Sequence, residues 1–184
     1  MKRFMCCFDK IIKLTSVNLK DKNLKDKNLN NIEGPISYND TIQFVPPIKK
    51  GVVIKVYDGD TITIASKLPY KESPIYRFSV RLSGIDCPEI KGKDENERKI
   101  AELAKKELSN LIMNKVVILE NVKTEKYGRV LADVYIDNIN LSNYMIEKGL
   151  AVPYDGTTKA VPHDWVYYYN NWLKHFKEEN TYHS

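Results

Sequence analysis

Two kinds of apolar periodicity run along the chain from residue 51 onward. Runs rich in β-branched residues and bounded by turn-forming residues predict five strands, at residues 52–58, 61–65, 76–82, 115–120 and 129–136. Apolar residues three and four positions apart predict three helices, at residues 94–113, 141–148 and 164–178. Five short strands with one helix inserted after the third favour a small closed β-barrel of the OB type, with helices packed on it.

The predicted helices carry signals at their ends. Asp94 followed by Glu97 resembles a capping box at the start of the first helix. Gly149 is a typical residue just beyond the end of the second helix. The last helix carries an aromatic stripe formed by Trp165, Tyr168, Tyr169, Trp172 and Phe176. Packing in the core is the simplest explanation of that stripe, and the alternative is a platform on which bases stack.

The N-terminal part of the chain has a different composition. Residues 19–30 repeat a five-residue unit of Leu, Lys, Asp, Lys and Asn, whose period fits neither a helix nor a strand. We therefore expect residues 1–45 to form a disordered or loosely held low-complexity arm, with a solvated helix as the alternative. Residues 46–184 are then the folded domain, which the chain enters through the stiff Pro46-Pro47 pair.

The charge is unevenly distributed. The net charge of the 184-residue chain is +5, and all of the excess lies in residues 1–50, because acidic and basic side chains are equal in number over residues 51–184. A body without net charge would bind nucleic acid through locally placed cations and not through a broadly basic face.

Membrane-spanning and disulfide-rich classes are excluded. No run approaches the roughly 18 apolar residues that a membrane span needs. The chain has 3 cysteines, too few for a disulfide framework. An apolar run near the N-terminus is broken by Asp9 and Lys10, so it is too short for a secretory signal peptide, and we expect an intracellular protein. Cys6 and Cys7, next to a basic start, leave lipid anchoring by acylation open.

Three polar clusters are candidates for chemistry. They are Asp58-Gly59-Asp60-Thr61, the segment from Arg81 through Asp86 to Glu89, and Glu125-Lys126-Tyr127-Gly128-Arg129. Each alone has an ordinary explanation, because Asp, Gly and Pro form turns. Together the three clusters supply the groups of a possible catalytic site. Carboxylates at strand ends suit a hard cation such as Ca²⁺ or Mg²⁺, two arginines can grip a phosphate, and a further carboxylate can orient a water. These are the groups needed to hydrolyse a phosphodiester.

Three longer segments resemble a known family. VYDGDTITI, RLSGIDCPEI and EKYGRVLADVYIDNINLSNYMIEKGLA are similar, in order and spacing, to the characteristic blocks of the staphylococcal nuclease (thermonuclease) family. The resemblance covers about residues 50–155. It implies an α+β, mainly β fold, namely a five-stranded OB-fold barrel with three helices. It also implies a Ca²⁺-dependent endonuclease that cleaves DNA and RNA, preferably single-stranded, at the bond to the 5′ oxygen and leaves 3′-phosphate ends.

The resemblance assigns metal ligands. Asp60 and Asp86 match the calcium-ligating carboxylates, and Asp58 matches an acidic neighbour that acts mostly through water. Cys87 lies where the family commonly has Thr, whose main-chain carbonyl binds the metal. Because Ca²⁺ prefers oxygen to sulfur, we expect the Cys87 thiol to take no part in binding.

The resemblance also assigns catalytic residues. Arg81 and Arg129 match the two arginines that hold and stabilise the phosphoryl group, and Glu89 matches the carboxylate assigned as the general base. Family members that serve only as binding modules have lost some of these acids and arginines. This chain keeps them, which favours an enzyme over the alternative, a non-catalytic OB-fold module that binds single-stranded nucleic acid.

Three further residues are assigned to substrate binding. Lys126 and Tyr127 match a phosphate-contacting lysine and a tyrosine that lines the nucleotide pocket. Tyr154 is a candidate second pocket tyrosine, at the point where the resemblance begins to weaken.

Overall fold

The computed structural model describes residues 34–125, 127–157 and 161–181, with residues 177–181 described by their backbone alone. Most of the predicted arm, including Cys6 and Cys7, lies outside the described residues. A short exposed 3-10 helix, η2, spans Tyr38–Asp40. The compact unit that contains the barrel begins at Gln43.

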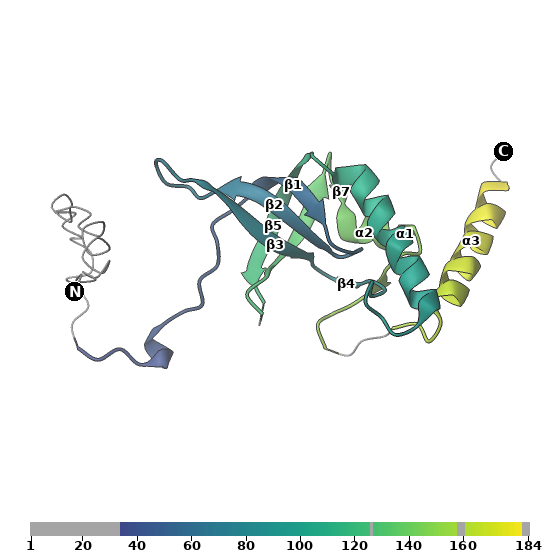
Figure 1. Cartoon of the computed structure of the whole chain (residues 1–184), viewed down its shortest axis with the longest axis horizontal. Coiled ribbons are helices and arrows are strands. Elements are labelled where there is room, and N and C mark those ends of the chain that lie inside the picture. The colour runs from purple at the N-terminus through teal and green to yellow at the C-terminus, as the bar shows by residue number, and fades with distance from the viewer. Residues whose placement is uncertain (1–33, 126, 158–160, 182–184) are drawn as a thin grey trace, which may run out of the picture. The chain divides into compact units, whose positions relative to one another are not determined.

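Five strands form the barrel (Figure 1). They are β1 (Lys50–Val56), β2 (Thr61–Lys67), β3 (Ile75–Leu82), β5 (Val116–Thr124) and β6 (Val130–Ile136). Their order is β3-β2-β1-β5-β6, with antiparallel neighbours, and a parallel pairing between β3 and β6 closes the sheet on itself. The predicted fold, a five-stranded OB-type barrel with three helices, is therefore confirmed.

Three two-residue strands complete the sheets. β4 (Ile85–Asp86) pairs with β8 (Val152–Pro153), and β7 (Ile139–Asn140) extends β6 through a tight turn. None of the three was predicted, because two residues are too few to show a period of two. β5 also runs four residues beyond its predicted end, since a β-bulge between Glu120 and Lys123 lets the pairing with β6 resume.

The core lies between the barrel and its first helix. Alternate residues of β6 point inward, so Val130, Ala132, Val134 and Ile136 are buried. The helices are α1 (Glu95–Ile112), α2 (Leu141–Glu147) and α3 (Trp165–Thr181). One face of α1, formed by Ile100, Ala101, Ala104, Leu108 and Ile112, is buried as well. In Figure 1, α1 lies between the strands and α3.

The start of α1 corrects one prediction. Asp94 caps the helix by accepting hydrogen bonds from the main-chain N–H groups of Asn96 and Glu97. The Glu97 side chain, however, does not complete a capping box with Asp94. It accepts a hydrogen bond from the N–H of Glu89 at 3.0 Å, because the loop before the helix folds back over its first turn. Glu97 therefore fixes that loop.

The aromatic stripe on α3 has two parts. Trp165 is 2% exposed and belongs to the core, as predicted, whereas Phe176 is 48% exposed. Trp172 stacks between Tyr169 and Phe176, with ring centroids 5.7 and 5.1 Å away. Trp172 also packs on Gly149, which has a φ of +65° just after α2, as its predicted position beyond the helix end requires. No described helix is both long and apolar enough to cross a membrane.

Candidate active site

The strand pairings bring distant polar residues to one end of the barrel. Thr61 pairs with Arg81 across β2 and β3, so the preceding Asp60 lies beside Arg81. The parallel closure pairs Arg81 with Leu131 on β6, two residues after Arg129. The β4–β8 pairing places Tyr154 nearby, and its N–H donates to the carbonyl oxygen of Gly84 at 2.9 Å.

Arg81 connects two buried carboxylates. Its Nη2 lies 2.8 Å from Asp60 Oδ2 and 2.9 Å from Asp86 Oδ1, and the three side chains are 11%, 5% and 3% exposed. Burial alone would lower the pKa of the guanidinium, but Asp60, Asp86 and Glu125 outweigh burial and raise its pKa above the ordinary value. Two carboxylate oxygens within 3 Å of one nitrogen form a compact oxygen-lined position for a cation.

The turn between β1 and β2 places the Asp60 carboxylate where its negative charge is unfavourable. The Asp60 N–H donates to Asp58 Oδ1 at 3.2 Å, and Thr61 Oγ1 donates to Asp60 Oδ1 at 2.7 Å. Burial raises the pKa of Asp60 to about 7; Arg81 opposes this shift, and the negative charge of Asp58 adds to it. Arg81 alone therefore does not keep Asp60 fully ionised at neutral pH. A second positive charge beside Asp60 would lower its pKa further and keep the carboxylate ionised.

The same turn packs tightly against its surroundings. A Cβ atom on Gly59 would lie 2.8 Å from Cys87 Sγ and 2.9 Å from Ala104 Cβ, so only glycine fits between the loop after β4 and helix α1. Cys87 is a free cysteine, 5% exposed. Burial, followed by the charges of Asp60 and Asp58, raises the pKa of its thiol well above the ordinary value. The thiol is therefore protonated and unreactive at neutral pH.

A second turn, between β5 and β6, carries Arg129. Glu125 Oε2 accepts a hydrogen bond from Arg129 Nε at 2.8 Å and lies 2.8 Å from Arg129 Nη2 in an ion pair, while Glu125 Oε1 lies 3.8 Å from Arg81 Nε. Glu125 thus links the two arginines. Glu125 was part of the third polar cluster in the sequence but was assigned no role, although an acid four residues before an arginine across a Gly-containing turn is a signal that the sequence contains.

A cavity of about 390 Å³ opens next to Arg81. Its lining includes Arg81, Lys123, Leu131, Tyr154 and Asp155. Leu131 pairs with Arg81 on one side and with Lys123 on the other, so an apolar side chain lies between two basic ones. Lys123 and Leu131 were also missed, because the bulge in β5 and the closure by β6 decide which side chains reach this cavity.

Of the remaining predicted site residues, two are exposed and one is not described by the structure. Glu89 is exposed, on a loop that Arg98 fixes through hydrogen bonds of 2.8 Å to the carbonyl oxygens of Gly92 and Lys93. Tyr127 is 78% exposed at the tip of the β5–β6 turn. Lys126 lies outside the described residues.

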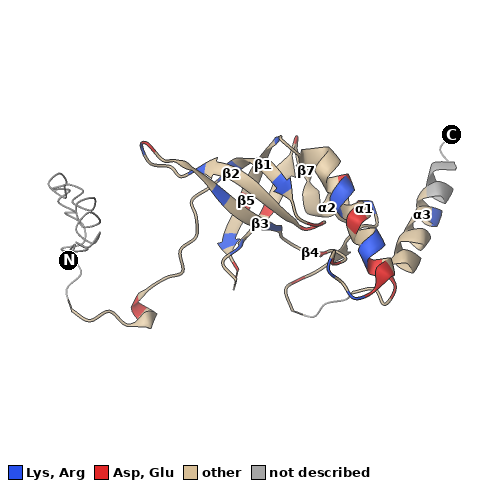
Figure 2. Ribbon diagram, viewed as in Figure 1, with Lys and Arg blue, Asp and Glu red and all other residues tan. Residues whose placement is uncertain are grey.

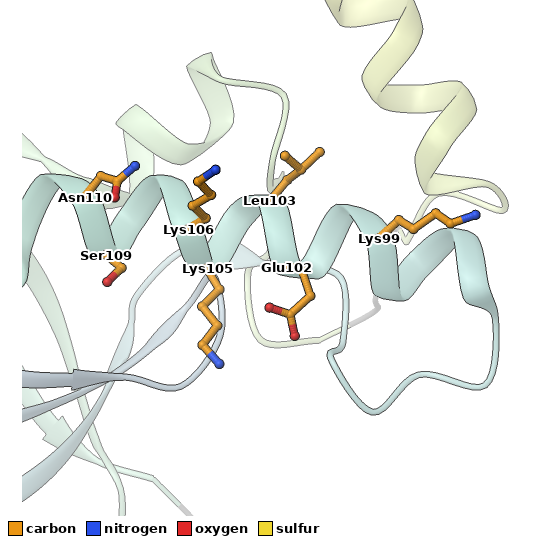
Figure 3. A pocket seen from close by; sticks show the side chains of 7 residues that line it. All are labelled: Lys99, Glu102, Leu103, Lys105, Lys106, Ser109 and Asn110. Atoms are coloured by element: carbon orange, nitrogen blue, oxygen red, sulfur yellow. The ribbon is translucent and has the colours of Figure 1, made fainter.

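Another hollow, of about 450 Å³, lies on the outer side of α1 (Figure 3). Its lining residues, among them Lys99, Glu102 and Lys105, all come from this one helix. Charges of both signs alternate along α1 (Figure 2). Lys99 pairs with Glu95 at 2.9 Å on this surface. Residues from several strands and loops meet at the barrel end, whereas this hollow is lined by one helix, so we place the candidate site at the barrel end.

Within the described residues, no group of three or more His, Cys, Asp or Glu side chains is arranged to hold a metal ion. The oxygen-lined position beside Arg81 is instead built from two carboxylates, those of Asp60 and Asp86. A Ca²⁺ site based on this pair would need main-chain carbonyl and water oxygens to complete its six to eight ligands.

Comparisons with known proteins agree with this geometry. The family described as staphylococcal nuclease homologue matches residues 79–171. An uncharacterized endonuclease of Haemophilus influenzae is 33% identical over 115 residues, which cover 62% of this chain and 56% of that protein. A probable endonuclease of Schizosaccharomyces pombe is 32% identical over 129 residues, or 58% of this chain and 56% of that protein.

An uncharacterized protein of Methanocaldococcus jannaschii is 31% identical over 144 residues, covering 64% of this chain and 66% of that protein. The chain thus spans 56–66% of the length of these three relatives. The family match over half of the chain agrees with the closed barrel and with the two arginines at its end. The chain belongs to the family of staphylococcal nuclease homologues.

Proposed function

We propose that the chain is a Ca²⁺-dependent endonuclease that hydrolyses phosphodiester bonds of DNA and RNA at the 5′ oxygen and leaves 3′-phosphate ends. The observation that carries this proposal is the pairing of Arg81 with two buried carboxylates while Arg129 lies on the adjacent turn. Family membership and the names of two relatives, both called endonucleases, support it.

The residues present fit a calcium ion. Asp60 and Asp86 would hold the ion directly, the main-chain carbonyl of Cys87 would add a ligand, and Asp58 would act through water. The raised pKa of Asp60 supports this assignment, because a buried carboxylate that is hard to ionise gains most from an added cation. When bound, Ca²⁺ would polarise the phosphate and supply an ordered water as the nucleophile.

The chain's own side chains would carry out the remaining steps. Glu89 would accept a proton from the attacking water, as the oxygen–phosphorus bond forms and the bond to the 5′ oxygen breaks. Arg81 and Arg129 would hold the phosphoryl oxygens, where negative charge grows during the displacement. Glu89 is exposed on a loop that Glu97 and Arg98 hold in place, so substrate can reach it.

The cavity beside Arg81 supports a preference for single strands. Leu131 and Tyr154 offer apolar and aromatic surface to a base, and Lys123 offers a cation to a neighbouring phosphate. A base inside a duplex is stacked and paired, so it must leave the helix to enter such a cavity, at a cost of a few kcal/mol. The resemblance assigns Lys126 and Tyr127 to substrate binding as well, and the exposure of Tyr127 would leave it accessible to a nucleotide.

The test is a cleavage assay on single-stranded DNA and RNA, with Ca²⁺ and then with excess chelator. We expect calcium-dependent cleavage and ends that become ligatable or labelable only after phosphatase treatment removes a 3′-phosphate. Asp60→Asn should weaken calcium binding and lower cleavage together, whereas Asp137→Asn, in the exposed β6–β7 turn, should change neither. Binding of single strands without cleavage would instead support the non-catalytic module.

A further inference from the structure

The two arginines of the site share one carboxylate. One carboxylate oxygen of Glu125 lies 2.8 Å from both Nε and Nη2 of Arg129, and its other oxygen lies 3.8 Å from Arg81 Nε. Nε and Nη2 form the edge of a guanidinium that grips a phosphate with two parallel hydrogen bonds. In this structure that edge of Arg129 is therefore occupied by Glu125.

The Glu125–Arg129 pair is suited to exchange. The Arg129 side chain is 33% exposed and that of Glu125 is 19% exposed, so solvent screens the pair. Ion pairs in such positions contribute about 1 kcal/mol or less, which an incoming phosphoryl group can exceed. The Arg81 contacts with Asp60 and Asp86, at 11%, 5% and 3% exposure, are much more deeply buried.

We propose that Glu125 is a positioning residue that binds the Arg129 guanidinium in the absence of substrate and releases it to the phosphoryl group as the transition state forms. This inference rests on the proposed function and adds to it an exchange of partners at Arg129, from Glu125 to the phosphoryl group. Glu125 competes with the substrate phosphate for Arg129, and it competes best when the phosphate carries little charge. Because the charge on the phosphoryl oxygens grows during the reaction, Arg129 transfers most completely in the transition state.

The backbone of the turn does not depend on the Glu125 side chain. The Glu125 N–H donates to the carbonyl oxygen of Arg129 at 2.8 Å, and the Gly128 N–H donates to the carbonyl oxygen of Glu125 at 2.9 Å. Glu125→Gln keeps the size of the side chain and these main-chain bonds, so the variant should fold. Circular dichroism and thermal unfolding check this directly.

The decisive experiment compares Glu125→Gln with the wild type in steady-state kinetics on single-stranded DNA with Ca²⁺. We expect KM to fall about threefold, because a competitor for Arg129 is lost, and kcat to fall about tenfold, because Arg129 is no longer aligned. Glu125→Asp should recover part of kcat. The matched control is Glu120→Gln, which removes an exposed carboxylate from the preceding strand β5 and should leave both constants unchanged.

A binding measurement judges the inference without turnover. Inorganic phosphate, titrated by calorimetry into the metal-free protein, should bind Glu125→Gln several-fold more tightly than the wild type, and Arg129→Ala in the same background should abolish the gain. Equal phosphate affinity in Glu125→Gln and wild type, or a loss of kcat with a rise in KM, would overturn the proposal. An inactive wild type with the expected phosphate result would count against the proposed function alone.

Discussion

Two turns at the same end of the barrel contrast sharply, although both are short, polar and contain glycine. The turn between β1 and β2 is buried: Asp58 is 8% and Asp60 3% exposed, and Gly59 touches both Cys87 and Ala104. The turn between β5 and β6 projects outward, with Tyr127 78% exposed and Gly128 in open space. One turn is part of the packed interior and the other is a surface loop.

The difference separates two requirements of a hydrolytic site. On the proposed function, the carboxylates of a metal site must be held rigidly, and the packing of the β1–β2 turn against α1 would hold Asp60 in this way. In the proposed reaction the Arg129 guanidinium must move onto the phosphoryl oxygens as their charge grows, so it needs a weaker restraint. The solvent-screened ion pair with Glu125 on the exposed turn would provide it. We therefore expect changes in the first turn to affect stability as well as the proposed metal binding, and changes in the second turn to affect mainly catalysis.

The largest expected effect is catalytic and lies in the exposed turn. Arg129→Ala should lower kcat by about 10²-fold or more, because removal of one donor that stabilises a developing oxyanion typically has this effect. The melting temperature should change by only a few degrees, since the lost ion pair is solvent-screened. Cleavage kinetics and thermal unfolding measure the two quantities. A variant in which only KM changes would show that Arg129 binds substrate uniformly.

The next effect concerns stability and compares the two glycines. Gly59→Ala should lower the free energy of unfolding by about 3 kcal/mol, because the new methyl group meets Cys87 and Ala104 at less than 3 Å. Gly128→Ala meets no atom within 4 Å and only places an L-residue at a φ of +76°, which costs about 1 kcal/mol. Urea unfolding of both variants checks the order. Equal losses would contradict the contrast between the turns.

A smaller effect is expected from pH in the metal-free protein. The pKa of Asp60 is about 7 in the folded state, against an ordinary value of 3.8, so between these values the folded state retains a proton that the unfolded state has released. Stability should therefore fall as pH rises from about 4 to 7, by at most about 1.4 kcal/mol per pH unit. Denaturant unfolding with chelator at several pH values measures the slope. Asp60→Asn should flatten it and Asp137→Asn should not.

The smallest effect is expected at Cys87. Its thiol is buried and protonated, and its proposed role belongs to the main-chain carbonyl, so Cys87→Ser should keep calcium-dependent cleavage within about threefold of the wild type. Glu89→Ala, two residues further on, should lose activity strongly if that carboxylate accepts the proton. Should Cys87→Ser abolish cleavage with fold and metal affinity intact, the thiol takes part in the chemistry.

The sequence predicts those parts of the molecule that depend on local pattern. β-branched runs located all five barrel strands, and apolar spacing located α1 from residue 94 to residue 113, its two cap positions. Its contacts with distant loops were not predictable in the same way. Glu97 has the spacing of a capping box, yet its partner is Glu89, because the path of the preceding loop decides which N–H comes within reach.

The candidate site shows the same division. The resemblance to nucleases identified Asp60, Arg81 and Asp86 as a group, and the structure places them in contact. Glu125 was named in a candidate cluster but given no role, and Lys123 was missed, because their importance comes from the closure of β6 on β3 and from a bulge in β5. Pairings between strands far apart in sequence leave no periodic signal in either strand.

The parallel pairing of β3 with β6 has a consequence for synthesis and folding. This contact joins segments separated by the whole of α1 and β5, and such long-range pairings form late, after loop-closure entropy has been overcome. Arg81 and Arg129 therefore meet only when β6 has joined the barrel. A nascent or truncated chain that ends with β5, before the β5–β6 turn, contains the acidic β1–β2 turn but lacks the second arginine. If the proposed function is correct, the site would be complete only at the close of folding, and the nascent chain would not cleave the RNA close to it.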